Sequence, residues 1–273
     1  MAHEDMTDQG PSFHADQVDS GQIDTLVAIL DVQAQLPGIQ RMRHWAHEAL
    51  AVTAGERALD IGSGTGSEAM AFAERVGADG EAVGIDPNPA MVAIAERRAA
   101  AAGSTARYVD GSVYELPFPD GHFDAIRCER VYQHLDDPAA ATAEIARALR
   151  PGGRVLLIDS DWHTSITHPG DPAVVRAISE TLLANTPNPA SGRRLRGLLV
   201  AAGFEIDDMG SEAVIWDPGS ALPLYDEMTE RAVAAGAVTA EQHDQFRADL
   251  NAGIAVGDYH LSVTMFAVLA HKR

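Results

Sequence analysis

The sequence predicts an α/β fold built on a doubly wound sheet, and a glycine-rich turn is the main reason. A short apolar strand, 57–61, is followed by Gly62, Gly64 and Gly66 and then by a helical pattern that starts near Ser67. Glycines allow positive φ and a close approach of the backbone to a ligand. Further strand patterns alternate with helical ones, which favours a largely parallel sheet with helices on both faces. Ligands bind such sheets at the carboxyl ends of the strands, where this turn lies.

The elements after the turn follow in order, each with its own signal. The next strand, 82–85, precedes a helix over 89–102, for which Asn88 is a suitable N-cap and Pro89 is tolerated in the first turn. Strands are then expected at 106–109 and 122–127. A helix over 138–150 and the Pro-Gly-Gly turn 151–153 lead into a fifth strand at 154–159.

The two ends of the chain are expected to be mostly helical. Residues 1–20 are polar and are expected to be mobile, and residues 21–273 to form a single domain. Its parts would be a helical cover (21–50), a ligand-binding core (51–160) and substrate-side insertions with the last strands (161–273). The elements expected in the outer parts are helices at 24–36, 39–50, 172–185 and 191–202, a helical insertion at 223–256 that forms a lid, and strands at 204–215 and 259–270.

Three consecutive strand ends carry an acidic residue. Asp60 lies two residues before Gly62, and a carboxylate there suits a ligand with an ammonium or sulfonium group. Asp86 is placed to accept both hydroxyls of a ribose, and Asp110 could accept an adenine amine. Residues 64–69 also match the G-x-G-x-x-A dinucleotide fingerprint, so a nicotinamide-dependent oxidoreductase is an alternative. Surface turns without a ligand are the other explanation for the two later acids.

These motifs together resemble the class I S-adenosylmethionine-dependent methyltransferases, in the small-molecule branch of the quinone and sterol methyltransferases. The resemblance covers about residues 50–160. The motifs that carry it are Leu59-Asp-Ile-Gly-Ser-Gly-Thr-Gly66, Gly84-Ile-Asp86, Asp110-Gly-Ser112, Leu116-Pro-Phe-Pro-Asp-Gly-His-Phe-Asp124 and Leu149-Arg-Pro-Gly-Gly153. It implies a seven-stranded Rossmann-like methyltransferase sheet with a reversed last strand, and an N-terminal segment that covers the cofactor.

The resemblance also implies S-adenosyl-L-methionine as the cofactor and a small organic molecule as the methyl acceptor. The residues expected to contact the cofactor are Asp60, Gly62, Ser63, Gly64, Gly66, Asp86, Pro87, Met91, Asp110, Gly111, Ser112 and Arg127. Arg41, Arg43 and His44 could face the cofactor carboxylate or the acceptor; a solvated helix face is the alternative.

Methyl transfer requires a base only if the acceptor atom carries a proton, and histidine suits this role near neutral pH. His134, after the fourth strand, is the first catalytic candidate; a structural histidine packed against the following helix is the alternative, and the sequence favours it slightly. His163 and Asp161, after the fifth strand, are further candidates. Asp159, Asp161 and His163 form only a weak metal-ligand pattern, so no metal is expected.

The composition limits the class of partner. A net charge of −20 disfavours a nucleic-acid substrate, because such proteins need a basic surface. The single cysteine excludes an internal disulfide, and no apolar run reaches transmembrane length. These features favour a cytoplasmic enzyme of undefined oligomeric state. A protein that binds the cofactor without methylating anything is the alternative from another functional class.

Overall fold

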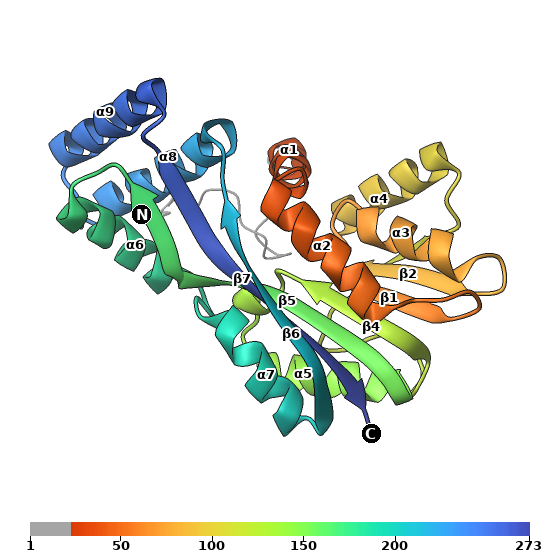
Figure 1. The fold of residues 1–273 in the computed structure, drawn as a ribbon. Helices are drawn as coiled ribbons and strands as arrows, with labels where there is room; N and C mark the ends of the chain where they lie inside the picture. Colours follow the sequence, from red (N-terminus) through yellow and green to blue (C-terminus); the bar gives the residue numbers. More distant parts are fainter. Residues whose placement is uncertain (1–22) are drawn as a thin grey trace, which may run out of the picture.

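The computed structural model describes residues 23–273, and the expectation for residues 1–20 lies outside this range. Seven strands form one sheet in the order β3-β2-β1-β4-β5-β7-β6 (Figure 1). The strands are β1 (Arg57–Ile61), β2 (Glu81–Asp86), β3 (Arg107–Asp110), β4 (Phe123–Glu129), β5 (Leu149–His168), β6 (Phe204–Ile215) and β7 (His260–Lys272). The first five are parallel and β7 runs antiparallel between β5 and β6. The predicted seven-stranded sheet with a reversed last strand is confirmed.

Helices cover both faces of the sheet (Figure 1). The helices are α1 (Ile23–Ala34), α2 (Pro37–Leu50), α3 (Ser67–Val76), α4 (Pro89–Ala102), α5 (Pro138–Ala148), α6 (Pro172–Asn185), α7 (Ser191–Ala201), α8 (Pro218–Ala234) and α9 (Ala240–Val256), with a 3-10 turn at Tyr132–His134. The predicted N-cap of α4 forms, since Asn88 Oδ1 accepts a hydrogen bond from Ala90 N at 3.0 Å. Helices α2, α3 and α4 lie on one face, and α5 and α7 on the other.

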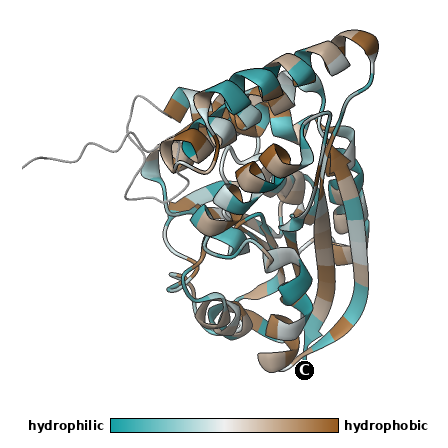
Figure 2. Cartoon of the chain, turned by 90° about the vertical axis from the view of Figure 1, so that its left-hand side faces the viewer, coloured by the Kyte–Doolittle hydropathy of each residue, from teal (hydrophilic) through white to brown (hydrophobic). Residues whose placement is uncertain are grey.

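The strands alternate between two apolar clusters, which explains why both faces are covered. Ala58, Ala125 and Leu156 belong to the cluster under α2 and α3, whereas Leu59 and Ile126 belong to the cluster under α5 and α7. Successive side chains of a strand point to opposite faces, so each strand contributes to both clusters. Figure 2 shows brown, hydrophobic segments along the strands and mixed segments on the surrounding helices.

Two elements differ from the prediction. Strand β5 begins at Leu149, so it includes the residues predicted as the helix end and the Pro-Gly-Gly turn. It also continues to His168 instead of ending at Asp159, because its second half pairs with the start of β7, from Ile166↔Ser262 to His168↔His260. This arm carries no apolar alternation that would reveal it in the sequence. The helical insertion is two helices, α8 and α9, separated by a turn with Thr239 as the capping-box residue of α9. In residues 23–273, no helix is long and apolar enough to cross a membrane.

Gly66 offers a test of the packing beneath the glycine turn. Its φ is +89°, and an added Cβ would lie 2.6 Å from Tyr108 Oη and 2.8 Å from Ala95 Cβ. Gly103 is in the same left-handed region, with φ +66° and nothing within 4 Å of an added Cβ, so it is a matched control. We expect Gly103→Ala to lose about 1–2 kcal/mol of stability from its backbone conformation. Gly66→Ala should lose about 2–5 kcal/mol because overpacking is added. Equal losses in urea unfolding would contradict the packing argument.

Candidate functional site

A cavity of about 430 Å³ lies at the carboxyl ends of the parallel strands, between the sheet and helices α1, α2 and α8. Ten of the twelve expected cofactor residues line it: Asp60, Gly62, Ser63, Gly64, Asp86, Pro87, Met91, Gly111, Ser112 and Arg127. The other two, Gly66 and Asp110, do not. The cavity also has a second half that extends past His134 to Trp162 and Trp216. The site is therefore one continuous cavity with two differently lined ends.

The first end is organised by the carboxylate of Asp86, which is 9% exposed. Its Oδ2 accepts from Gly64 N at 2.9 Å and its Oδ1 accepts from Asn88 N at 3.0 Å. Burial raises the pKa of this carboxyl above its ordinary value. The two backbone donors fix the carboxylate at the glycine turn, where it can accept hydrogen bonds from hydroxyl groups of a ligand.

Gly66 and Asp110 have positions different from those expected. Gly66 is the N-cap residue of α3, and its carbonyl oxygen accepts from Tyr108 Oη at 2.7 Å. Tyr108 leaves no room for a Cβ there, so this glycine is needed for packing. Asp110 ends the edge strand β3 with an exposed side chain, opposite Asp86 in register. The next two residues, Gly111 and Ser112, do line the cavity. Of the motif Asp110-Gly-Ser112, only Gly111 and Ser112 therefore reach the cavity.

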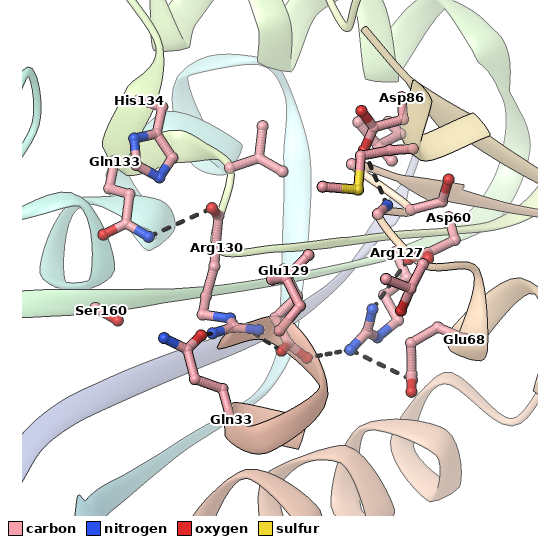
Figure 3. Close-up of a pocket in the computed structure, with 18 of the residues that line it drawn as sticks. Gln33, Asp60, Glu68, Asp86, Arg127, Glu129, Arg130, Gln133, His134 and Ser160 are labelled. Atoms are coloured by element: carbon pink, nitrogen blue, oxygen red, sulfur yellow. Dashed lines mark hydrogen bonds and ion pairs between the residues drawn. The ribbon is translucent and has the colours of Figure 1, made fainter. Parts of the chain in front are cut away.

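Asp60 belongs to a buried network of charges around Arg127. Arg127 Nη1 donates to Asp60 Oδ1 at 2.9 Å, and Nη2 lies 3.3 Å from Glu68 Oε2 and donates to Glu129 Oε2. Arg43 of α2 donates to Glu129 from Nη2 at 2.9 Å. Figure 3 shows Asp60, Arg127, Glu68 and Glu129 in contact along the cavity. The sequence reasoning identified Asp60, Arg127 and Arg43, and missed the two glutamates.

The charges in this network shift the pKa values of its acids in opposite directions. Burial raises the pKa of Asp60 to about 6, and Arg127 only partly offsets this. Burial also disfavours the charged form of Glu68, but Arg127, His47 and Arg43 outweigh it and hold its pKa at about 2. The same balance, dominated by Arg127 and Arg43, keeps the pKa of Glu129 well below its usual range. Near pH 7 this network therefore combines the carboxylates of Asp60, Glu68 and Glu129 with the guanidinium groups of Arg127 and Arg43, and a third guanidinium, that of Arg130, lies 3.3 Å from Glu129.

The N-terminal helices cover the cavity. Leu26, Leu30 and Gln33 of α1 line it, and α1 is fixed to α4 by two hydrogen bonds of 2.7 Å between Arg98 and Asp31. Of the three basic residues expected to face the cavity, only Arg43 does. The others are on the outer surface of α2, with Arg41 paired to Glu212 and His44 to Glu48.

The second end of the cavity is lined mainly by large apolar and aromatic side chains. His134, Gln133 and Arg130 come from the turn after β4 (Figure 3). Trp162 Nε1 donates to Gln133 Oε1 at 2.7 Å, which fixes both side chains. The remaining walls include Val214, Trp216, Leu224, Val263 and Met265. Arg130, Gln133 and Trp216 were not predicted from the sequence; the first two could have been found as neighbours of His134.

Asp161 and His163 lie outside the cavity. Asp161 is fully buried and forms an ion pair with Arg193 of α7, and His163 is exposed. The reason is strand alternation: Ser160 and Trp162 of β5 face the cavity, so the odd-numbered residues face away from it. Asp159 also points away from the cavity, and no cluster of three His, Cys, Asp or Glu able to hold a metal occurs within the described part of the chain.

The family whose model matches this chain is described as a methyltransferase domain, and the match covers residues 59–157. A protein of Streptomyces fradiae described as an uncharacterized 37.1 kDa protein in a transposon is 32% identical over 248 residues, which are 89% of this chain and 70% of that protein. The demethylmenaquinone methyltransferase of Thermus thermophilus is 38% identical over 119 residues. This match covers 44% of the chain and 54% of the Thermus protein, so the chain spans about half the length of this relative.

Two solved structures share the fold of this chain. The YcgJ protein of Bacillus subtilis has a TM-score of 0.57 and 25% identity, over 83% of this chain and 99% of that one. A structure titled as an S-adenosylmethionine-dependent methyltransferase of Aquifex aeolicus has a TM-score of 0.55 and 17% identity, over 93% and 98% of the two chains. The second likeness concerns the fold alone.

The buried Asp159 provides a test of the electrostatics beneath the site. It is 0% exposed, accepts from Ser160 N at 2.7 Å and from Gln133 N at 3.1 Å, and burial raises its pKa from 3.8 to about 7. The folded protein therefore binds a proton between pH 4 and 7 that the unfolded chain does not bind. This contribution to stability is complete below pH 4 and is lost as the pH rises through 7.

We expect Asp159→Asn to remove that pH dependence. Between pH 4 and pH 8, the unfolding free energy of the native protein minus that of the variant should fall by about 4 kcal/mol. Urea unfolding at several pH values measures the difference. Asp110→Asn, which changes an exposed carboxylate, is the control and should give parallel curves. If the unfolding free energy of Asp159→Asn also ran parallel to that of the native protein across this pH range, the raised pKa of Asp159 would be contradicted.

Proposed function

The chain belongs to the class I S-adenosylmethionine-dependent methyltransferases, and we propose that it transfers the methyl group to an oxygen, nitrogen or carbon atom of a small organic metabolite. The observation that carries this proposal is the single cavity with two ends. One end has the glycine turn and the acids of a cofactor site. The other is mainly apolar, as suits a small organic acceptor, and contains a histidine that can serve as a base. The names of relatives such as demethylmenaquinone methyltransferase support an apolar metabolite as the acceptor.

The side chains of the first end fit the cofactor. Ser63 lines the cavity, and its Oγ, buried beside Gly84, has no hydrogen-bond partner among the described residues and so is available to a ligand. Gly62 has φ +70°, and a Cβ there would lie 2.3 Å from Val131 Cγ2, so the turn cannot carry a side chain. We propose that Asp86 accepts the ribose hydroxyls and that Gly111 and Ser112 lie against the adenine.

The cofactor supplies an electrophilic methyl group on a sulfonium, and no covalent bond to the protein is needed. The contribution of the chain is to bind, align and exclude water. Leu26 and Leu30 of α1 close the cavity from outside. Asp60 and Glu129 supply negative charge close to where the positive sulfonium and ammonium groups would lie. Their own counterion, Arg127, keeps them in place.

His134 is the proposed base for acceptors that lose a proton. It lies at the end of the 3-10 turn, on the side of the cavity opposite Asp86 (Figure 3). Its backbone N donates to Val131 O at 2.9 Å, so the turn fixes its position. We assign no catalytic role to Asp161 or His163, because they lie outside the cavity.

The nicotinamide-dependent alternative is not favoured. It rested on the G-x-G-x-x-A match alone, and Gly66 in that match packs under Tyr108 instead of facing the cavity. The other alternative is a protein that binds the cofactor but does not methylate. Measured turnover of an acceptor would exclude it. We further propose that the reaction takes place in the cytoplasm, which the single, unpaired Cys128 supports.

The cofactor assignment predicts a specific role for Asp86. We expect calorimetry to give saturable binding of S-adenosylmethionine and S-adenosylhomocysteine and none of NADH. Asp86→Ala should weaken this binding by about 1–3 kcal/mol, because ribose hydroxyls lose a charged acceptor. Asp110→Ala, at the neighbouring strand end but outside the cavity, is the matched control and should bind nearly as the native protein does. Binding of NADH alone would refute the assignment.

The proposed base predicts a change in the pH profile of turnover. With an acceptor found by screening, His134→Gln should lower kcat about 100-fold or more. It should also remove the rise of kcat with pH that deprotonation of a histidine base produces. Affinity for S-adenosylhomocysteine should stay within twofold of the native value. His44→Gln, on the outer surface, is the control. A variant that keeps the native pH profile would show that His134 is structural.

A further inference from the structure

Arg130 reaches the cavity by breaking the alternation of β4. Arg127 and Glu129 of this strand face the cavity, so the next residue would be expected to face the opposite side. Arg130 instead has φ +57°, and its side chain lies in the cavity next to Glu129 (Figure 3). Its backbone N donates to Ile158 O at 2.8 Å, and its carbonyl oxygen accepts from Gln133 Nε2 at 3.3 Å.

This backbone conformation is costly for a residue with a long side chain. A non-glycine residue in the left-handed region is uncommon, and such residues cluster at functional sites. The other described example, Ala51, caps the end of α2, where a left-handed residue is ordinary. No helix end accounts for Arg130, and a glycine would make the same turn at lower cost. We therefore attribute this backbone conformation to the arginine side chain that it directs into the cavity.

The guanidinium of Arg130 lies beside Glu129 but is incompletely hydrogen-bonded by the described residues. Nη1 donates to the neutral amide oxygen of Gln33. Nε lies 3.3 Å from Glu129 Oε1, without the geometry of a hydrogen bond. Glu129 itself is already hydrogen-bonded to both Arg43 and Arg127. Burial lowers the pKa of the Arg130 guanidinium, which reflects the cost of placing a cation there. An anionic ligand would offset that cost.

The surroundings of Arg130 differ from those of the other two arginines. Arg127 lies beside Asp60 and Glu68, at the cofactor end, whereas Arg130 lies on the side of Gln133 and His134 (Figure 3). The walls beyond it are apolar: Val214, Trp216, Leu224, Val263 and Met265. The acceptor half thus combines one arginine with an extended apolar surface.

We infer that the methyl acceptor is an apolar molecule with one oxyanion, such as a carboxylate, and that Arg130 binds this group while the tryptophan-lined walls hold the apolar part. This inference rests on the proposed function and specifies its substrate class. Guanidinium groups suit the task because they form paired hydrogen bonds with carboxylates. The carboxylate of the cofactor has the same chemistry, so the test must distinguish the two sources.

The test uses four full-length proteins. Arg130→Met removes the charge at similar length, and Arg130→Lys retains it. Arg41→Met removes an exposed arginine that pairs with Glu212 outside the cavity, and is the matched control. Calorimetry first measures S-adenosylhomocysteine. With that compound saturating at pH 7.5, it then measures two matched pairs: 2-naphthoate with 2-naphthamide, and 4-phenylbutyrate with 4-phenylbutyramide.

We expect the native protein and Arg41→Met to bind at least one acid 10-fold or more tightly than its amide. Arg130→Met should lose this preference while its amide affinity stays within about twofold, and Arg130→Lys should keep part of it. All four proteins should bind S-adenosylhomocysteine equally, which also shows that they are folded. If Arg130→Met does not fold, Arg130→Gln replaces it in the same comparison.

Three results would overturn the inference while leaving the proposed function intact. They are equal binding of acids and amides by the native protein, no binding of either acid, and an acid preference retained in Arg130→Met. Loss of S-adenosylhomocysteine affinity in folded Arg130→Met would assign Arg130 to the cofactor carboxylate and also overturn it. Failure of the native protein to bind S-adenosylhomocysteine would instead refute the proposed function, and this inference with it.

Discussion

The buried guanidinium of Arg127 is the group on which the arrangement of the site depends. It is 2% exposed and lies among the carboxylates of Asp60, Glu68 and Glu129, which come from β1, α3 and β4. Leaving such a charge without a partner costs about 3–5 kcal/mol, so these elements can pack only with their acids directed at it. Asp60 is therefore a structural counterion as well as part of the cavity wall, and its carboxylate is already oriented before a ligand arrives.

The same charges attach the cover of the cavity to its floor. Arg43 and His47 of α2 contact Glu129 and Glu68 at 2.9 and 3.0 Å. The other side of α2 packs against β6, through contacts such as that of Gly38 with Val214. Helix α1 is held by the partly exposed pair Asp31–Arg98, by Gln33 and by the buried side chain of Leu26.

Local signals in the sequence predict the core of this fold because they depend on neighbouring residues only. The glycine turn, the strand-end acids and the N-cap Asn88 give the sheet and ten of twelve cofactor-end residues at the cavity. Asp110 and Gly66 belong to the same motifs, but which residue of a motif faces inward depends on the edge position of β3 and on packing against Tyr108. Glu68 and Glu129 were missed because counterions are set by tertiary contact, which no local pattern records.

At the acceptor end, strand alternation predicts the direction of some side chains correctly and that of Arg130 wrongly. Once β5 is known to extend past Asp159, alternation alone puts Ser160 and Trp162 in the cavity and Asp161 and His163 outside it. Alternation gives the wrong side for Arg130, because one left-handed residue after β4 reverses the direction of its side chain. Residues of the regular strands thus provide much of the apolar wall, and Arg130, with its left-handed backbone, provides the positive charge. The proposed binding of an acceptor oxyanion therefore depends on a backbone conformation that the sequence does not reveal.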